Sequence, residues 1–323
     1  MKKTILLSAV TLMIIFAGCG DAGWKDIFNG KDFKGFMQQG GQAQFIVENG
    51  EMVGISTANT PNSFMCTEDE YGDFILEFDV MVDTLLNSGV QIRSHSIEYP
   101  HAVVVYGYQV EIDPSDRGWS AGIYDEARRG WLYPVTPYNP DAVTVFDKTG
   151  WNRYHIEAIG TRIRTWLNGV PVADMLDYAD TTGFIGFQVH AVEEELAGTK
   201  VRWKNIRIAT KNLEKFMISD GLSVKQVNFI PNTISEYEKA DGWKLLFDGV
   251  SSEGWRGAHM DAFPDTGWVI EHGYFRVLSS GGGESAGGGD IVTVEEYDNF
   301  ELSFEFMITK GANSGVKYFV TED

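Results

Sequence analysis

The sequence predicts an all-β protein, built as an antiparallel sandwich, and three observations support this. Apolar and polar residues alternate with a period of two through most of the chain, whereas helical periodicity is nearly absent after the first residues. Short β-prone runs are separated by turn signals, which fits a content of 36 Gly in 323 residues. No helical segment stands between these runs to form a parallel crossover. Many short strands without crossovers are typical of an antiparallel sandwich.

The first two thirds of the chain contain the clearest strand patterns. Leu167-Asn168-Gly169-Val170 carries the Asn-Gly pair that favours a two-residue hairpin turn. Further along, residues 232–240 read as one short helix that is capped at its start. The expected strands are Phe45–Val47, Met52–Ser56, Phe74–Val82, Val90–Ser94, Ala102–Asp113, Asn152–Ile159, Ile163–Leu167, Phe184–His190 and Val201–Ile208.

Composition and charge exclude several classes of protein. A formal charge of −20 repels phosphate backbones and anionic lipids, so binding of nucleic acid and electrostatic adhesion to membranes are not expected. A hydrophobic content of 43% with 22% charged residues excludes a disordered chain. Only 2 Cys are present, too few for a disulfide scaffold or a four-thiolate zinc site.

The N-terminus reads as an export signal. Lys2 and Lys3 precede an apolar run from Thr4 to Ala17 that is too short to cross a bilayer as a helix. Phe16-Ala17-Gly18-Cys19 resembles the lipobox of bacterial lipoproteins, which predicts a signal peptide over 1–18, lipidation of Cys19 and a tether over 19–23. The protein would then be held on a bacterial membrane, facing the periplasm or the cell surface, by its lipid alone. An ordinary cleaved signal is the alternative. Cys66 is expected to be a buried small hydrophobe.

The chain contains two copies of one unit. Residues 23–30 return at 242–249, and residues 45–50 return at 268–273. Further matches join 71–78 to 297–304 and 87–90 to 313–316. This predicts a first domain over 24–210, a connector over 211–241 and a partial second domain over 242–323. The second copy is expected to be a fragment, because half a sandwich exposes its inner faces; a domain lacking half its strands is the alternative.

Polar residues alternate with apolar ones on three of the expected strands. Gln91 and Arg93 face away from Val90 and Ile92 on one strand. The other two strands place Gln109, Glu111 and Asp113 on one face and Gln188 and His190 on another. If the three strands are neighbours, these rows form one groove with side chains of catalytic type. The alternative is that each row is the solvated face of a sheet.

Other known site patterns are weaker in this sequence. Glu111 and Asp113 are two apart on one face, about 6.5–7 Å between Cα atoms, which permits the carboxylate pair of a retaining glycosidase. Concanavalin A-like glucanases have a third acid at the position of Gln109, so this sequence departs from their pattern. A Glu, Asp and His cluster could hold a divalent cation, but no spacing requires one. The loop Gly281–Gly289 lacks the Lys-Ser/Thr pair of a phosphate loop and is expected to be a flexible connection.

Several segments together resemble the 3-keto-disaccharide hydrolase family, whose members are secreted bacterial domains with a concanavalin A-like jelly-roll sandwich. The resemblance runs from Trp24 to about Thr210 and resumes at Gly242. The segments that carry it are NSGVQIRS (Asn87–Ser94), GYQVEID (Gly107–Asp113), GWLYP (Gly130–Pro134), WNRYHIEAIGTRIRTWLNG (Trp151–Gly169), GFIGFQVH (Gly183–His190) and VRWKNIRI (Val201–Ile208).

This resemblance implies cleavage of glycosides already oxidised to a ketone at sugar carbon three. The ketone acidifies the hydrogen at carbon two; a base abstracts it, the aglycone leaves carbon one, and water adds back. His190 or Glu111 would be the base, and Arg93 would hold the enolate oxygen. No cofactor is required, but a separate sugar 3-oxidoreductase must supply the substrate, because the chain has no nucleotide-binding unit. The expected sugar-binding residues are Asn87, Gln91, Gln109 and Gln188, with Tyr124, Trp131 or Trp166 as a stacking platform.

Two other functions remain open from the sequence. One is a non-catalytic glycan-binding lipoprotein that uses the same groove, and the other is a conventional glycosidase. The two copies also differ: Lys317 stands in the place of Gln91, and Phe319 in that of Arg93. A Lys lacks the planar fork of a guanidinium, so chemistry is expected in the first copy and stacking or support in the second. The alternative is that the second copy has an active site of its own.

Overall fold

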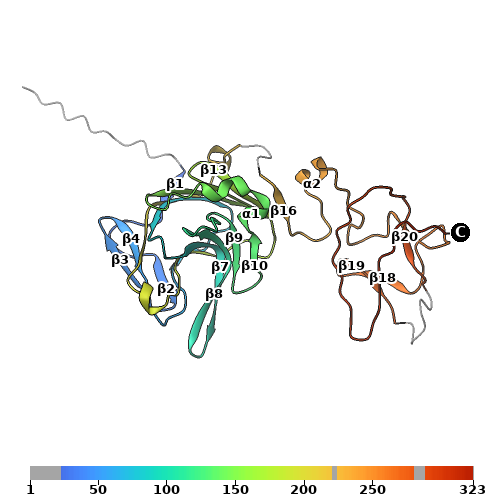
Figure 1. Ribbon diagram of the computed structural model, residues 1–323, viewed down its shortest axis with the longest axis horizontal. Coiled ribbons are helices and arrows are strands. Elements are labelled where there is room, and N and C mark those ends of the chain that lie inside the picture. The colour runs from blue at the N-terminus through green and yellow to red at the C-terminus, as the bar shows by residue number, and fades with distance from the viewer. Residues whose placement is uncertain (1–22, 220–223, 280–287, 323) are drawn as a thin grey trace, which may run out of the picture. The chain divides into compact units, whose positions relative to one another are not determined.

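The computed structural model describes residues 23–219, 224–279 and 288–322. The chain divides into two compact units, with the boundary between Val227 and Asn228 (Figure 1). The predicted signal peptide, Cys19 and most of the loop Gly281–Gly289 lie outside the described residues. In the part that is described, no helix is long and apolar enough to span a membrane.

The first unit is a sandwich of two antiparallel sheets, which confirms the predicted fold class. The nine-stranded sheet runs in the order β16 (Gln226–Asn228), β13 (Val170–Leu176), β12 (Arg162–Leu167), β11 (Asn152–Ile159), β6 (Phe74–Val82), β15 (Lys200–Ala209), β4 (Glu51–Ile55) and β3 (Gln44–Glu48), with β1 (Trp24–Asp26) also paired to β15. The seven-stranded sheet runs in the order β10 (Gly130–Tyr133), β9 (Ile123–Glu126), β8 (Ala102–Ile112), β7 (Ser88–Tyr99), β14 (Phe184–Val189), β5 (Ser63–Thr67) and β2 (Phe36–Gly40).

Helices contribute little to the described residues of this unit. Only α1 (Val135–Tyr138) and three short 3-10 turns (Pro140–Thr144, Glu194–Leu196 and Leu213–Lys215) interrupt the strands.

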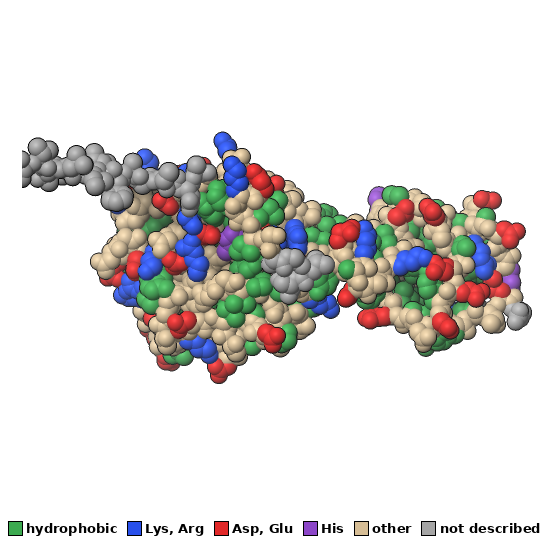
Figure 2. Space-filling view, turned by 90° about the horizontal axis from the view of Figure 1, so that it is seen from above, with side chains coloured by type: hydrophobic (Ala, Val, Ile, Leu, Met, Phe, Trp, Pro, Cys, Tyr) green, Lys and Arg blue, Asp and Glu red, His purple; other side chains and the backbone are tan. Residues whose placement is uncertain are grey.

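Acidic and basic side chains lie next to one another over the surface (Figure 2).

Period-two alternation builds the core between the sheets. Along β6, Phe74, Leu76 and Phe78 are fully buried in this core, whereas Glu77 and Asp79 point away from it. The ring of Phe78 stacks on that of Tyr154 in β11, with centroids 4.9 Å apart. Removing this much aromatic and aliphatic surface from water is the main favourable term for folding.

The predicted Asn-Gly hairpin is confirmed. Leu167 pairs with Val170, and the two turn residues Asn168 and Gly169 have φ values of 51° and 81°. Two positive φ values in succession are the signature of a type I′ turn, which matches the twist of the strands that it joins.

The strands that were not predicted are mostly short and lack alternation. All five residues of β5 are buried, because both faces of this strand are covered. A covered strand shows no period of two, so the sequence pattern misses it.

The seven-stranded sheet curls strongly toward the face that points away from the core. Its edge strand β2 approaches β8, although β5, β14 and β7 lie between them in the sheet. Across the same face, Asn62 Nδ2 next to β5 donates to Glu126 Oε1 in β9 over 3.1 Å. This curled outer face is where the predicted polar rows lie.

The second unit has two short sheets among its described residues. They pair β17 (Trp255–Gly257) with β20 (Ile291–Thr293) and β18 (Trp268–Glu271) with β19 (Tyr274–Val277). Its helix α2 (Glu236–Ala240) is shorter than the predicted 232–240, because Ser235 is its N-cap residue and forms a reciprocal capping box with Glu238.

Candidate functional site

A buried row of polar side chains crosses the outer face of the seven-stranded sheet. The strands β8, β7 and β14 are neighbours, as the groove hypothesis required. Gln91, Gln109, Glu111 and Gln188 share this face, and we call them the polar row. These four residues are only 0–3% exposed, so the row is not a solvated sheet face. Buried polar groups of this kind need partners or a function.

Hydrogen bonds in the polar row all lead toward Glu111. Ser94 Oγ donates to Gln91 Oε1 over 2.7 Å, and Gln91 Nε2 donates to Gln109 Oε1 over 2.8 Å. Gln109 Nε2 then donates to Glu111 Oε2 over 3.1 Å. Each amide therefore directs the positive end of its dipole at the carboxyl group, which is held in one orientation.

Gly89 explains how these side chains fit together. It pairs directly with Glu111 on β8, and the amide of Gln109 lies over it. A Cβ atom on Gly89 would be 2.4 Å from Gln109 Cδ, which only the absence of a side chain avoids. On its other side Gly89 neighbours Gln188, because Phe187 pairs with Val90. Glu111 and Gln188 thus face each other across a residue without a side chain.

Glu111 combines deep burial with hydrogen bonds from two amides and contact with a cation. Burial raises its pKa to about 7, and hydrogen bonds from Asn87 and Gln109 together with the charge of Arg117 only partly oppose this. Asn87 Nδ2 donates to Glu111 Oε1 over 2.7 Å. A carboxyl group whose pKa lies near neutral pH can both take and return a proton.

Arg117 is the cation at this site, and the sequence analysis missed it. Its Nη2 donates to Glu111 Oε1 over 3.2 Å, and its Nε donates to Asp113 Oδ2 over 2.8 Å. The guanidinium lies 4.8 Å from the ring centroids of both Trp119 and Trp131. The only sequence signal was a basic residue in the loop directly after the strand that carries Glu111.

Asp113 orients Arg117 and the loop around it. Its Oδ1 accepts from the backbone N–H of Ser115 over 3.0 Å. Burial alone would raise the pKa of Asp113, but hydrogen bonds from Ser115 and Arg117 lower it below its ordinary value. An ionised carboxylate that is hydrogen-bonded to a guanidinium is better suited to positioning that guanidinium than to nucleophilic attack.

Partly exposed residues form a rim around the polar row. Tyr124 pairs with Gln109, and its ring lies 5.1 Å from that of Trp131. On the other side, His190 Nδ1 lies 2.7 Å from Ala191 O, and the charge of His190 acts on Glu126. Burial nevertheless raises the pKa of Glu126 above its ordinary value. Of the two bases expected from the sequence, Glu111 lies in the polar row and His190 lies at its rim.

Arg93 does not share the face of Gln91, which corrects the sequence analysis. The pairing of β7 with β8 shifts between Ile92 and His95, so that Arg93 and Ser94 together oppose Gly107. Arg93 has a φ of 47° and turns toward the other sheet. There Nε donates to Gly72 O over 2.9 Å and Nη1 to Gly160 O over 2.7 Å. A bulge breaks strict alternation, and Arg93 ties the two sheets together.

Trp166 is likewise in another part of the molecule. It lies in β12 of the nine-stranded sheet and is 2% exposed, so it offers no platform beside Glu111. Its ring lies 5.2 Å from that of His155. His155 Nδ1 is 2.9 Å from Glu77 Oε1, and its Nε2 is 3.2 Å from Glu157 Oε1. Alternation alone does not indicate which sheet a strand will join.

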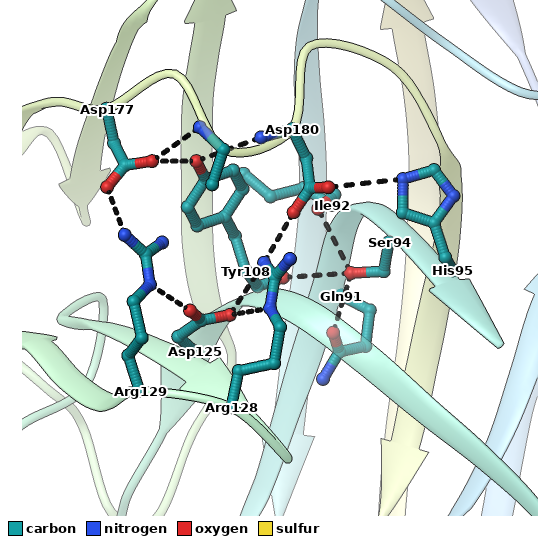
Figure 3. Close-up of polar contacts among 11 residues, drawn as sticks. Gln91, Ile92, Ser94, His95, Tyr108, Asp125, Arg128, Arg129, Asp177 and Asp180 are labelled. Carbon is teal, nitrogen blue, oxygen red and sulfur yellow. Dashed lines mark hydrogen bonds and ion pairs between the residues drawn. The ribbon is translucent and has the colours of Figure 1, made fainter. Parts of the chain in front are cut away.

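The polar row also connects, through Gln91 and Ser94, to an ion-pair network around Asp125 (Figure 3). Ser94 Oγ lies 3.3 Å from Tyr108 O, and the Tyr108 hydroxyl donates to Asp177. Arg128 and Arg129 both donate to the fully buried Asp125. Each of these guanidiniums also reaches an aspartate of the segment after β13, so the network fixes the β9–β10 hairpin.

Within the residues that the structure describes, no three or more His, Cys, Asp or Glu side chains are grouped so that they could hold a metal ion. The two carboxylates nearest to each other in the site, Glu111 and Asp113, both contact Arg117.

Both units of the chain match one known protein family. Residues 23–209 and 242–323 match the model of the 3-keto-alpha-glucoside-1,2-lyase-like domain. The chain belongs to this family. The predicted family resemblance is therefore confirmed, and it covers both units.

Individual relatives are more distant or shorter matches. A 3-keto-disaccharide hydrolase of Bacteroides thetaiotaomicron is 42% identical over 85 residues, which cover 26% of this chain and 29% of that protein. A crystal structure of a candidate glycosyl hydrolase from Parabacteroides distasonis is 21% identical, with a TM-score of 0.43, over 59% of this chain and 95% of that one. The carbohydrate-binding module CBM66 of Bacillus subtilis is 16% identical, with a TM-score of 0.37, over 54% of this chain and 95% of that one.

Proposed function

We propose that this protein cleaves the glycosidic bond of 3-keto-disaccharides or related 3-keto-glycosides, with Glu111 as the proton-transferring residue. The observation that carries the proposal is the buried Glu111 carboxyl, which has a pKa of about 7 and accepts hydrogen bonds from Asn87 and Gln109. Membership of the 3-keto-alpha-glucoside-1,2-lyase-like family and the name of the Bacteroides relative support the substrate class.

The reaction follows from the acidity that a ketone confers. The Glu111 carboxylate takes the proton from carbon two of the sugar, and the electron pair of that C–H bond moves into the enolate of the carbon-three ketone. The enolate then reforms the ketone as the bond from carbon one to the leaving oxygen breaks, which leaves a double bond between carbons one and two. The leaving oxygen takes the proton back from Glu111. Addition of water across the double bond completes hydrolysis.

Arg117 takes the role that the sequence analysis gave to Arg93. Its guanidinium lies against the rings of Trp119 and Trp131 and is within hydrogen-bond distance of the reacting carboxyl. A fixed cation at this place stabilises the negative charge of the enolate oxygen without further reorganisation. The same cation opposes the rise in the pKa of Glu111, so that a fraction of the molecules has this carboxyl group ionised near neutral pH.

A conventional double displacement is less consistent with the geometry. It requires a second carboxyl group free to act as nucleophile or acid. Asp113 is instead bound to Arg117 and to the backbone of Ser115.

The proposal extends to where the protein works. We place it outside the cytoplasm, anchored by a lipid on Cys19 to a bacterial membrane, and downstream of an enzyme that oxidises sugars at carbon three. Replacement of Cys19 by Ser should abolish labelling by a fatty-acid probe and release the protein from the membrane fraction. Membrane retention of this variant would contradict the lipid anchor.

The activity itself is tested with a 3-keto-disaccharide and its unoxidised parent. The wild-type protein should release the ketosugar and the aglycone from the first and leave the second intact. Glu111→Gln should lose at least a thousandfold in kcat, because the amide cannot take the proton. Binding of the keto-sugar by the wild-type protein without any release of products would favour a glycan-binding protein instead.

A further inference from the structure

Two glutamine side chains on the outer face have buried polar atoms without hydrogen-bond partners among the described residues. Both polar atoms of the Gln188 side chain are buried without a partner among the described residues, and the same holds for Gln39 Oε1. The neighbouring amides of Gln91 and Gln109 are in contrast bonded to each other. Burial of an amide with nothing to bind opposes folding, so such groups in a native protein call for a partner, either a ligand or an ordered water.

Gln39 and Gln188 belong to one row of residues across the sheet. Gln39 in β2 pairs with Phe64 in β5, and Phe64 pairs with Gln188 in β14. Gln188 neighbours Gly89, which pairs with Glu111. With about 4.8 Å between strands, Gln188 lies two strands, or about 10 Å, from Glu111, and Gln39 lies on the far side of Phe64.

The alternation of β14 shows that Gln188 points at this outer face. Phe187 and Val189, on either side of it, belong to the core between the two sheets. Gly186, which has the same parity as Gln188, lies against the outer-face residues Cys66 and Gln91. Phe64 packs with Cys66 and Phe184 in an apolar cluster that is separate from the main core.

We propose that Gln39, Phe64 and Gln188 form a subsite for a second, uncharged pyranose ring. An amide offers a donor and an acceptor side by side, which suits a pair of neighbouring sugar hydroxyls. The ring of Phe64, between the two amides, provides an apolar surface for the C–H face of the sugar. None of these three residues is charged, which suits an uncharged ring. The inference rests on the proposed function only in its last step, that this ring is joined to the one cleaved at Glu111.

Access to this subsite requires a movement of the sheet edge. Gln188 is fully buried, so a ring reaches its amide only when the curled sheet opens. The strand β2 is paired on one side only, to β5, so its displacement breaks the backbone hydrogen bonds of one strand pair. The hydrogen bond from Asn62 to Glu126 spans the same face and must break first.

Binding is measured by calorimetry on the full chain carrying Glu111→Gln, so that no turnover contributes. The probes are the unoxidised disaccharides maltose and cellobiose, with glucose as the single ring. We expect one of the disaccharides to bind, and Gln188→Leu and Gln39→Leu each to weaken it at least tenfold. The control Asn168→Ala, in a distant hairpin turn, should leave the affinity unchanged.

Chemical unfolding separates a ligand-binding role of Gln188 from a structural one. If its amide stabilised the fold, its removal would lower the denaturation midpoint. Gln188→Leu should leave the denaturation midpoint unchanged or raise it, because it removes a buried group without partners. Gln91→Leu should lower the midpoint, because it breaks bonds to Ser94 and Gln109. Equal loss of stability in both variants, unchanged affinity in Gln188→Leu, or binding of neither disaccharide would overturn the subsite. Binding without any cleavage of 3-keto-disaccharides by the wild-type protein would overturn the proposed function alone.

Discussion

Arg117 Nη2 lies 3.2 Å from Glu111 Oε1, and the two residues are only six positions apart in the chain. The turn after β8 brings the guanidinium back over the strand, and Trp119 and Trp131 hold it there. A cation in contact with a buried carboxyl lowers the pKa of that carboxyl, against the effect of burial. This pair therefore controls both the charge and the protonation of the candidate site.

Removal of the Arg117 charge should change the rate and the pH profile together. We expect Arg117→Met to lower kcat at least a hundredfold and to move the rise of activity to higher pH, because Glu111 then ionises less readily. Arg117→Lys should restore part of the pH profile but less of the rate, since Lys lacks the planar fork. Steady-state kinetics on a 3-keto-disaccharide between pH 5 and 9 measure both. Lys148→Met, which removes an exposed cation paired with Asp116, is the matched control. An unshifted profile in Arg117→Met would contradict the assignment.

Gly89 should tolerate no side chain. In Gly89→Ala the new Cβ would collide with Gln109 Cδ, which displaces the amide from Glu111. We expect a loss of about 1–3 kcal/mol in the free energy of unfolding and a larger loss of activity. Gly72→Ala is the control, because its Cβ would meet only ordinary contacts at 3.5 Å and beyond. Urea unfolding and activity assays on both variants test this; full activity in Gly89→Ala would show that Gln109 does not matter for Glu111.

Stability should depend on pH through His155. Burial opposes its charged form, but hydrogen bonds to Glu157 and Glu77 raise the pKa of His155 above its ordinary 6.5. For Glu77, burial is outweighed by His155 and Arg207, which lower its pKa from 4.5 to about 2. The histidine therefore stabilises the fold below pH 6.5 and loses this effect as the pH rises through its raised pKa. The carboxylate stabilises above pH 4.5 and loses its effect as the pH falls toward 2.

Replacement of His155 tests this window. His155→Phe should cost about 3 kcal/mol at pH 5.5 and clearly less at pH 9, where the wild-type ring is neutral. Denaturant titrations at the two pH values provide the numbers, with the exposed His101→Phe as control. A penalty that is equal at both pH values would mean that packing against Trp166, and not charge, is what His155 contributes.

The first unit should be active without the second. All residues of the polar row and Arg117 precede Val227, the last residue of that unit. A chain of residues 24–227 should therefore keep its turnover of 3-keto-disaccharides. A chain ending at Thr210 should be less stable, because it loses the bond from Ile218 N–H to Glu157 and the contact of Phe216 with Trp24. An inactive but folded 24–227 chain, rescued by the second unit, would show that both units form the site.

Much of the fold was predictable because alternation reports burial. The strands β6 and β11 were predicted to the residue, since one face of each meets the core and the other carries charged side chains. Gln91, Gln109, Glu111 and Gln188 were placed on one face for the same reason. The strands β5 and β9 were not predicted, because β5 is covered on both faces and β9 is only four residues long.

The sequence by itself determined the sandwich class, the family and the residue types of the polar row, because these depend on local periodicity and on motifs. Tertiary structure alone decided that Arg93 leaves the row at a bulge, that Trp166 belongs to the other sheet, and that Arg117 returns to Glu111. It also buried the row, since the curl of the sheet brings β2 toward β8. The pKa of Glu111 follows from that burial, a long-range effect that no pattern of neighbouring residues contains.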